Sequence, residues 1–196
     1  MGKMKKYLIF GLGGITNSGK STIAAMLCKN LPFVEVMCQD NYFLDPDDAQ
    51  IERDEDGVRN WEKLSALNMN KMTSDVETWI AKHSSKVSDQ ISVLVIEGFL
   101  IFNHSKLSSL MDYKYFIQIN QETCKERRIK RVYVPPDPPG YFENYVWPMY
   151  LENLEAITDK DDIEFIDGML DLNTLFSEIL QRINSAIETT ASCIGT

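Results

Sequence analysis

The sequence predicts an α/β fold, a three-layer sandwich with a central parallel sheet of about five strands. Short apolar segments alternate with amphipathic segments along the whole chain. Strands that alternate with helices in this way form parallel sheets with right-handed crossovers. The 196 residues, of which 44% are hydrophobic and 25% charged, have the size and composition of one globular domain. We therefore expect a single domain over residues 1–196.

Five apolar segments predict the strands. The segment 91–96 is almost entirely apolar, as is typical of a central parallel strand that is buried on both faces. The segment 7–12 is a short apolar run that leads into a glycine-rich turn. The predicted strands, in chain order, are residues 7–12, 34–38, 91–96, 113–119 and 163–167.

Five further segments carry apolar residues at helical spacing. Residues 62–82 give the strongest such pattern, whereas residues 45–60 are polar and acidic and predict a loop. Pro148 should kink or restart the helix around it, because proline lacks the backbone N–H that a helix needs. The predicted helices are residues 21–30, 62–82, 121–132, 144–157 and 172–188.

Charge and composition exclude several classes of protein. The net charge of −9 disfavours nucleic-acid binding, which needs clustered lysine and arginine. Apolar runs fall short of the ~20 residues of a membrane span, so we expect a cytoplasmic protein without a membrane partner. The four cysteines form no C-x-x-C pair and predict free thiols, and the lone His83 and His104 are expected on the surface. No pattern indicates a protein partner, and we expect a monomer.

Residues 14–21, GITNSGKS, match the phosphate-binding pattern G-x-x-x-x-G-K-[ST] between a predicted strand and a predicted helix. In such a loop the backbone N–H groups point at phosphate oxygens, and the helix N-terminus adds positive charge. Lys20 is expected to reach the β- and γ-phosphates and Ser21 to bind Mg²⁺. The pattern predicts a P-loop NTPase-type fold that binds a nucleoside triphosphate. The phosphate contacts expected from this pattern are Gly14, Ile15, Thr16, Asn17, Ser18, Gly19, Lys20 and Ser21.

Other signatures of P-loop proteins are weak in this sequence. Residues 54–57 match the D-x-x-G pattern of GTPases, but they lie in a polar segment and not at the end of an apolar strand. Asn70 and Lys71 are followed by Met72 and Thr73, so the guanine-binding N-K-x-D pattern is missing. A motor ATPase must couple ATP hydrolysis to mechanical work, and a single short domain offers no second part to which that work could be transmitted. A kinase remains the favoured class.

Two acidic residues follow predicted strands. Asp40 comes after the strand 34–38, and Glu97 comes after the strand 91–96. Ligands of parallel sheets bind at the carboxyl ends of the strands, which places both carboxylates near the phosphates. Asp40 could take a proton from a substrate hydroxyl and help to bind Mg²⁺. The alternative is that both are solvated loop acids.

Three arginines in the segment 121–142 predict a lid over the phosphates. Arg127 and Arg131 are four residues apart and share a helix face, whereas Arg128 points about 100° away. Positive charge over a transferring phosphoryl group is what catalysis requires. The alternative is a solvated helix face on which the arginines pair with neighbouring glutamates.

Aromatic residues gather in and beside the predicted loops. Some belong to core packing, but enough remain to form a platform for a flat base. Glu62 next to Trp61 is either an ordinary acid of a first helical turn or a carboxylate that binds ribose hydroxyls. The aromatic candidates are Tyr42, Phe43, Trp61, Tyr133, Tyr141, Phe142, Tyr145 and Trp147.

Several blocks of sequence together resemble the nicotinamide riboside kinases, which are related to uridine kinase. They occur in order and span most of the chain. The segments RVYVPPDPPGYF and VWPMY are far more specific than the phosphate loop. The other blocks are GITNSGKS, CQDNYF, NWEKLSALNM and IEGFLIFN.

The resemblance implies ATP- and Mg²⁺-dependent phosphorylation of nicotinamide riboside, and of nicotinic acid riboside, at the 5′-hydroxyl. It implies that Asp40 is the general base, that Lys20 and Glu97 complete the catalytic set, and that Ser21 and Asp40 bind Mg²⁺. The positions that it assigns to ATP binding besides residues 14–21 are Thr22, Arg127, Arg131, Val132 and Tyr133. Those that it assigns to the nucleoside are Asp40, Asn41, Tyr42, Phe43, Trp61, Glu62, Arg128, Tyr133, Val134 and Asp137.

Two positions depart from the family pattern. Glu62 stands where an aspartate is expected, and its extra methylene moves the carboxylate by roughly 1.5 Å. Asn41 stands where a second aspartate is expected and removes a negative charge beside Asp40. A pyrimidine nucleoside kinase and a nucleotide-dependent binding or switch protein remain the alternative functions.

Overall fold

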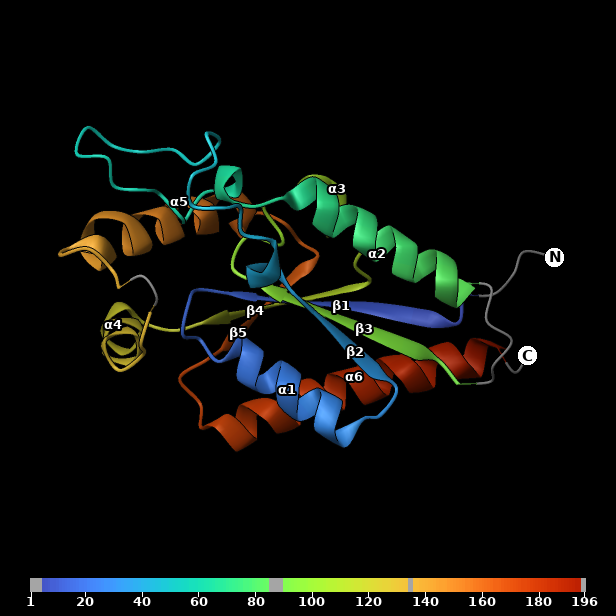
Figure 1. Ribbon diagram of the computed structural model, residues 1–196. Coiled ribbons are helices and arrows are strands. Elements are labelled where there is room, and N and C mark those ends of the chain that lie inside the picture. Colours follow the sequence, from blue (N-terminus) through green and yellow to red (C-terminus); the bar gives the residue numbers. More distant parts are fainter. Residues whose placement is uncertain (1–4, 85–89, 134–135, 195–196) are drawn as a thin grey trace.

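The chain forms a three-layer α/β sandwich in a computed structural model that describes residues 5–84, 90–133 and 136–194 (Figure 1). Within these residues one sheet of five parallel strands has the order β2-β3-β1-β4-β5. The predicted fold class is confirmed. The strands are β1 (Tyr7–Gly14), β2 (Val34–Cys38), β3 (Ser92–Gly98), β4 (Tyr113–Gln118) and β5 (Ile163–Asp167).

Helices cover both faces of the sheet, as Figure 1 shows. They are α1 (Lys20–Asn30), α2 (Met69–Ser84), α3 (Ser105–Ser108), α4 (Gln121–Ile129), α5 (Trp147–Thr158) and α6 (Leu172–Ile194). Helices α1 and α6 pack on one face through Ile23, Leu27 and Ile179, and α2, α3 and α5 pack on the other. Helix α4 lies at the carboxyl end of the strands (Figure 1).

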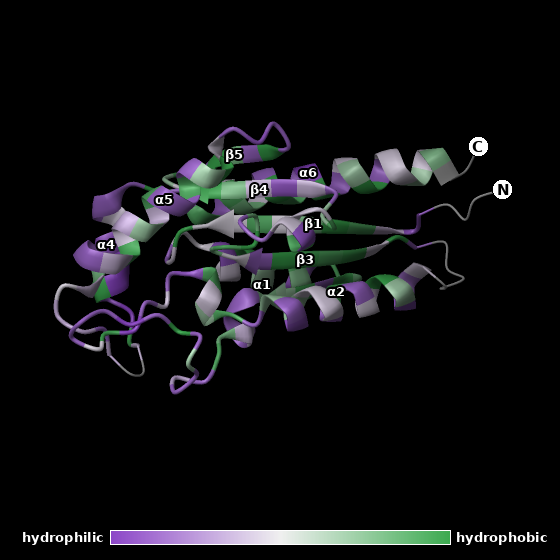
Figure 2. Cartoon of the chain, turned by 90° about the horizontal axis from the view of Figure 1, so that it is seen from above, coloured by the Kyte–Doolittle hydropathy of each residue, from purple (hydrophilic) through white to green (hydrophobic). Residues whose placement is uncertain are grey.

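Hydrophobic residues follow the strands, and hydrophilic residues gather in the loops at the strands' carboxyl end (Figure 2). Strand β3 is buried from Val93 to Gly98, which agrees with its apolar sequence. Within the described residues, no helix combines the length and apolar character of a membrane span. All four cysteines are free thiols, as predicted.

The predicted helix 62–82 is wrong at its start. Helix α2 begins only at Met69, and a 3₁₀ turn, η2 (Leu64–Ala66), precedes it. The Asn68 side chain accepts a hydrogen bond of 3.0 Å from the backbone N–H of Lys71, so it caps the helix. Leu67 instead forms an antiparallel bridge with Phe43. The apolar residues therefore keep a helical spacing before Met69, although tertiary contacts, and not a helix, determine the backbone there.

The interruption expected at Pro148 is confirmed. A π-helical turn, η3 (Phe142–Val146), ends where α5 begins, and Pro148 lies in the first turn of α5. A first-turn N–H has no partner within its helix, so proline is tolerated there.

The expectation that His83 lies on the surface is wrong. The His83 side chain is 3% exposed and stacks on Trp79 with ring centroids 4.0 Å apart. Its Nδ1 lies 2.8 Å from the Trp79 carbonyl oxygen. His104 is partly exposed, and its ring accepts a hydrogen bond of 3.2 Å from Leu107 N at the start of α3, a helix that is too short for periodicity to predict.

The carboxyl ends of β2 and β3 pack too closely for a side chain at Gly98. A Cβ there would lie 2.4 Å from Cβ of Gln39 and 2.8 Å from Cγ2 of Ile101. Gln39 is fully buried in the turn η1 (Gln39–Tyr42), and its side-chain oxygen accepts a hydrogen bond of 2.9 Å from Leu100 N. The position of Gln39, and of Asp40 after it, therefore depends on a glycine at position 98.

We expect Gly98→Ala to lower the free energy of unfolding by about 1–3 kcal/mol, because the added methyl must displace Gln39. Urea denaturation measures this change. Ser92→Ala, at the partly exposed opposite end of β3, is the control and should change the stability by less than about 0.5 kcal/mol. Equal stability of Gly98→Ala and the control would contradict the close packing.

Candidate active site

A cavity of about 920 Å³ lies at the carboxyl ends of the strands. The phosphate loop, the ends of β2 and β3, the helix α4 and the segment 43–62 all contribute to its walls. It contains the acidic, basic and aromatic residues that the sequence analysis selected from distant parts of the chain. The predicted site residues that line it are Thr16, Asn17, Gly19, Lys20, Ser21, Thr22, Asp40, Phe43, Trp61, Glu62, Glu97, Arg127, Arg128, Arg131, Tyr133 and Asp137.

The phosphate loop joins β1 to α1 through residues with positive φ. Gly14 has a φ of 143°, Asn17 of 60° and Gly19 of 102°. A Cβ at Gly14 would also lie 2.5 Å from the carbonyl oxygen of Ile117. Two constraints therefore favour glycine at the start of the loop, where the chain turns sharply toward the helix.

The same loop contains polar side chains that could form further hydrogen bonds. The Ser18 hydroxyl is buried, and no hydrogen-bond partner for it exists among the described residues. The Lys20 ammonium lies in the cavity wall, and its Nζ donates a hydrogen bond of 2.8 Å to the Ile15 carbonyl oxygen. Burial lowers the pKa of Lys20, while Glu97 and Asp40 oppose this change. A bound anion fits this environment, because it supplies the missing acceptors and counter-charge.

Carboxylates from two adjacent strands meet opposite the phosphate loop. Cys38 pairs with Glu97 across β2 and β3, so Asp40 and Glu97 lie near the same edge. The Ser21 hydroxyl donates a hydrogen bond of 2.9 Å to Oε1 of Glu97. Burial and the negative charge of Glu97 raise the pKa of Asp40, and the Lys20 ammonium opposes them.

These oxygen donors fit Mg²⁺. The described residues contain no cluster of three or more histidine, cysteine or acidic side chains that would enclose an ion. Mg²⁺ usually binds through one or two protein oxygens together with substrate phosphates and water, so a smaller set is sufficient. Ser21, Asp40 and Glu97 are the residues that could contribute.

Helix α4 brings its arginines to the cavity. Arg127 donates a hydrogen bond of 3.1 Å to the carbonyl oxygen of Asn17 in the phosphate loop. The Arg131 guanidinium carbon lies 5.1 Å from the centroid of the Tyr133 ring. Both arginines are exposed and face the space above the loop, where they are free to contact a polyphosphate.

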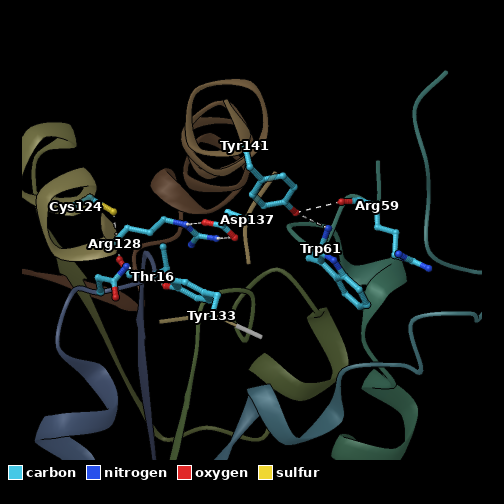
Figure 3. A network of polar contacts seen from close by, with 9 residues as sticks. Thr16, Arg59, Trp61, Cys124, Arg128, Tyr133, Asp137 and Tyr141 are labelled. Carbon is cyan, nitrogen blue, oxygen red and sulfur yellow. Dashed lines mark hydrogen bonds and ion pairs between the residues drawn. The ribbon is translucent and has the colours of Figure 1, made fainter. Parts of the chain in front are cut away.

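Arg128, by contrast, is buried and forms a two-pronged ion pair with Asp137 (Figure 3). Its Nε and one terminal nitrogen donate to the two carboxylate oxygens over 2.7 and 3.0 Å. Its guanidinium carbon lies 4.5 Å from the Tyr133 ring centroid. The Tyr133 hydroxyl lies 3.3–3.4 Å from the side chains of Asn17 and Thr16. These contacts fix one wall of the cavity to the phosphate loop.

The opposite wall is aromatic. The Phe43 ring meets Trp61 edge to face with centroids 5.7 Å apart and stacks on Phe99 at 6.0 Å. Tyr141, which also lines the cavity, supports Trp61, because its hydroxyl oxygen accepts a hydrogen bond of 3.0 Å from the backbone N–H of Trp61 (Figure 3). Both faces of the cavity thus present aromatic rings, which suit a flat ligand.

Glu62 lies between the two walls. Its backbone is held at both ends, since its N–H donates to the Asn60 side chain over 3.1 Å and its carbonyl accepts from Asn153 over 3.3 Å. Burial raises the pKa of Glu62 to about 7, with Arg128 opposing and Asp137 adding to the increase. A carboxylate that has lost its water in this way is prepared to accept hydrogen bonds from a ligand's hydroxyls.

Several residues that the sequence analysis selected do not contribute to the cavity wall. Asn41 is exposed outside it, Tyr42 donates its hydroxyl over 2.9 Å to Asp75, and the Val132 side chain is 87% exposed. Val134 lies outside the described residues. Gly14, Ile15 and Ser18 are buried within the phosphate loop.

Of the aromatic candidates, some line the cavity and others do not. Those that line it are Phe43, Trp61, Tyr133 and Tyr141. Phe142 is buried in a cluster against which Trp147 packs, and the Tyr145 hydroxyl contacts Asp54 outside the cavity. Sequence reasoning missed Arg59 and Phe99 as lining residues. Phe99 follows Glu97 and Gly98 directly, so its place beside a strand end was a usable signal, whereas Arg59 lies in an irregular segment that gives none.

The raised pKa of Glu62 predicts a pH dependence of stability in the absence of ligand. An acid with a higher pKa in the folded state binds its proton more tightly there, so its stabilising contribution is lost as the pH rises toward 7. Between pH 5.5 and 8.0 the free energy of unfolding should therefore fall by about 2 kcal/mol more in the wild type than in Glu62→Gln. Urea denaturation of both proteins at both pH values measures this difference. Parallel pH profiles of the two proteins would contradict the assigned environment of Glu62.

Solved structures with similar folds include a possible uridine kinase from Bacillus stearothermophilus, a sugar kinase and a gluconokinase. A sugar kinase from Janibacter sp. HTCC2649 aligns over 91% of this chain and 95% of its own with a TM-score of 0.59 at 14% identity. A gluconokinase from Sinorhizobium meliloti 1021 aligns over 94% of this chain and 96% of its own with a TM-score of 0.55 at 13% identity. At such identities the likeness supports the fold alone.

Sequence comparison defines the family more narrowly. No family model matches the chain. Nicotinamide riboside kinase 1 of Homo sapiens is 41% identical over 186 residues, which cover 91% of this chain and 92% of the human protein. Nicotinamide riboside kinase 1 of Mus musculus is 39% identical over 193 residues, covering 94% and 97% of the two chains. Identity at this level over nearly the whole length confirms the resemblance of the sequence blocks, and the chain belongs to the nicotinamide riboside kinase family.

Proposed function

We propose that the protein transfers the γ-phosphoryl group of ATP to the 5′-hydroxyl of nicotinamide riboside, giving ADP and nicotinamide mononucleotide, a salvage step toward NAD. The observation that carries the proposal is one continuous cavity in a chain of this family. It joins a phosphate loop, a carboxylate at Asp40 and an aromatic–acid pair at Trp61 and Glu62. We further propose that the enzyme uses Mg²⁺ and acts as a cytoplasmic monomer. The free thiols support a reducing compartment.

The phosphate end of the cavity binds the triphosphate. The backbone N–H groups of the phosphate loop and the Lys20 ammonium hold the β- and γ-phosphates, and Arg127 and Arg131 approach from α4. Mg²⁺, held by Ser21 and Asp40 with Glu97 behind them, would neutralise charge on the phosphate oxygens. The cavity thus concentrates cations where negative charge develops during transfer.

Asp40 acts as the general base. The 5′-oxygen attacks the γ-phosphorus in line, the bond to the β-phosphate oxygen breaks, and the hydroxyl proton passes to the Asp40 carboxylate and then to water. A raised pKa makes Asp40 a stronger base than an ordinary aspartate. Lys20, whose ammonium opposes that increase, keeps the carboxylate ionised for the reaction.

The nucleoside end suits a cationic base. Nicotinamide riboside carries a positively charged pyridinium ring, whereas uracil and cytosine are neutral. The aromatic face of Trp61 attracts cations, and the Glu62 carboxylate adds negative charge. Glu62, Arg128 and Asp137 together offer acceptors and donors for the ribose hydroxyls.

We expect nicotinamide riboside and nicotinic acid riboside to stimulate ADP release from Mg²⁺-ATP far more than uridine, cytidine or pantothenate. A coupled assay of ADP over this panel measures the stimulation. A preference for uridine or cytidine would show that the nucleoside end was misassigned and that the protein is a pyrimidine nucleoside kinase. Tight ATP binding without stimulation by any nucleoside would instead indicate a nucleotide-dependent switch.

We expect Asp40→Asn to lower kcat by about 10²–10⁴-fold, because the amide cannot accept the hydroxyl proton. Binding of a non-hydrolysable ATP analogue, measured by calorimetry, should remain within a few-fold of the wild type because the phosphate loop is intact. Asp161→Asn, in the exposed loop before β5, is the control and should leave both quantities unchanged. Near-normal turnover of Asp40→Asn would exclude Asp40 as the base.

A further inference from the structure

Tyr141 connects two parts of the site that are distant in sequence. Its side chain is only 4% exposed. The hydroxyl oxygen accepts a hydrogen bond of 3.0 Å from Trp61 N and lies 3.3 Å from the carbonyl oxygen of Arg59, to which it donates. One buried hydroxyl therefore satisfies backbone groups on both sides of Asn60 (Figure 3).

The segment that carries Trp61 has little regular structure to hold it. Between η1 and η2 its backbone is organised by turns, by an isolated bridge between Arg53 and Arg59, and by the bridge of Phe43 to Leu67. Side chains from the region of η3 and α5 supply further contacts. Asn153 donates to the Glu62 carbonyl, and the Asn60 side chain donates to the Met149 sulfur over 3.5 Å. Trp61 is thus positioned largely by groups some 80 residues further along the chain.

The ring of Tyr141 reaches the other wall of the cavity. The Arg128 guanidinium carbon lies 5.8 Å from the Tyr141 ring centroid and 4.5 Å from that of Tyr133. Arg128 in turn holds Asp137. Figure 3 shows Asp137 between Arg128 and Tyr141, with the Tyr141 hydroxyl directed at Arg59 and Trp61. The same side chain therefore contacts both walls between which a nucleoside would lie.

We infer that Tyr141 is a positioning residue for the nucleoside. It fixes the Trp61 backbone, and hence the indole, relative to the Arg128–Asp137 pair. It acts without touching the phosphate loop. This inference rests on the proposed function, because it assigns the Trp61 wall to the nucleoside. Its consequence is specific, because loss of the hydroxyl should weaken nucleoside binding and leave the chemistry on ATP intact.

The variant Tyr141→Phe removes the hydroxyl and keeps the ring. The unpaired Trp61 N–H should raise KM for nicotinamide riboside on the order of tenfold, equivalent to ~1.4 kcal/mol. The kcat and the KM for ATP should change by less than about twofold. The matched control is Tyr145→Phe, which keeps the ring that stacks on Tyr141 with centroids 5.0 Å apart. It removes only a hydroxyl that contacts Asp54 outside the cavity wall. Its KM should equal that of the wild type.

A double-mutant cycle tests whether Tyr141 acts through Trp61. In the background Trp61→Ala, the further change Tyr141→Phe should raise KM for the nucleoside by less than about twofold, since the group that it positions is absent. Each rate is divided by the concentration of protein that binds an ATP analogue, so that unfolded protein does not lower the apparent kcat. Additive effects, or a fall in kcat at constant KM, would overturn the inference.

The two hypotheses fail in different ways. A wild type that does not phosphorylate nicotinamide riboside overturns the proposed substrate, and the cycle is then measured with the nucleoside of the panel that the wild type accepts. A wild type that is active on nicotinamide riboside, together with an unchanged KM in Tyr141→Phe, overturns the positioning role and leaves the proposed function standing.

Discussion

The register of three neighbouring strands fixes the position of the phosphate-side groups. Gly13 of β1 pairs with Gly98 of β3, and Glu97 pairs with Cys38 of β2. The phosphate loop, Glu97 and Asp40 therefore start from one edge of the sheet. Because β1 and β3 are packed against helices on both faces, a slip by one residue would turn each side chain toward the opposite layer and break its packing, so the core enforces this register.

The two ends of the cavity are built by different means. Groups at the phosphate end project from strand ends and the first turn of a helix, whose geometry the sheet dictates. At the nucleoside end, Trp61 and Glu62 lie in irregular chain, and side chains from a distant segment hold them through Tyr141 and Asn153. The phosphate end is therefore the rigid part of the site, and the nucleoside end is the part in which substitutions can adjust selectivity. Residue Glu62, at which the chain departs from the expected aspartate, lies in this second part.

Most of the fold could be predicted from the sequence, because the strands are nearly continuous apolar runs and a phosphate loop follows the first of them. The bounds of β2 and β5 agree with the prediction to the residue. The predicted start of α2 was wrong because Leu64 and Leu67 fit a helical period by chance, whereas Leu64 lies in a 3₁₀ turn and Leu67 forms a bridge with Phe43. Local pattern cannot reveal such long-range contacts.

In the candidate site, too, residues placed by local sequence patterns could be predicted, and residues placed by long-range contacts could not. Lys20, Asp40 and Glu97 could be selected because motif and strand end gave their positions. The role of the Tyr141 hydroxyl had no sequence signal, since a tyrosine in a proline-rich loop is equally consistent with stacking. The burial of His83 against Trp79 likewise had no sequence signal, because an isolated histidine near a polar segment is expected on the surface.

The distribution of charge along the cavity suits the different charges of the two proposed substrates. The protein is acidic overall, with 29 acidic against 20 basic residues, yet Lys20, Arg127 and Arg131 all line the phosphate end of the cavity. ATP brings negative charge to that end, and a pyridinium nucleoside would bring positive charge to the end that holds Glu62. Burial displaces the pKa values of the Lys20 ammonium and the Glu62 carboxylate toward their neutral forms. Each ligand would bring the opposite charge to one of these groups, so ligand binding would favour the charged forms of Lys20 and Glu62.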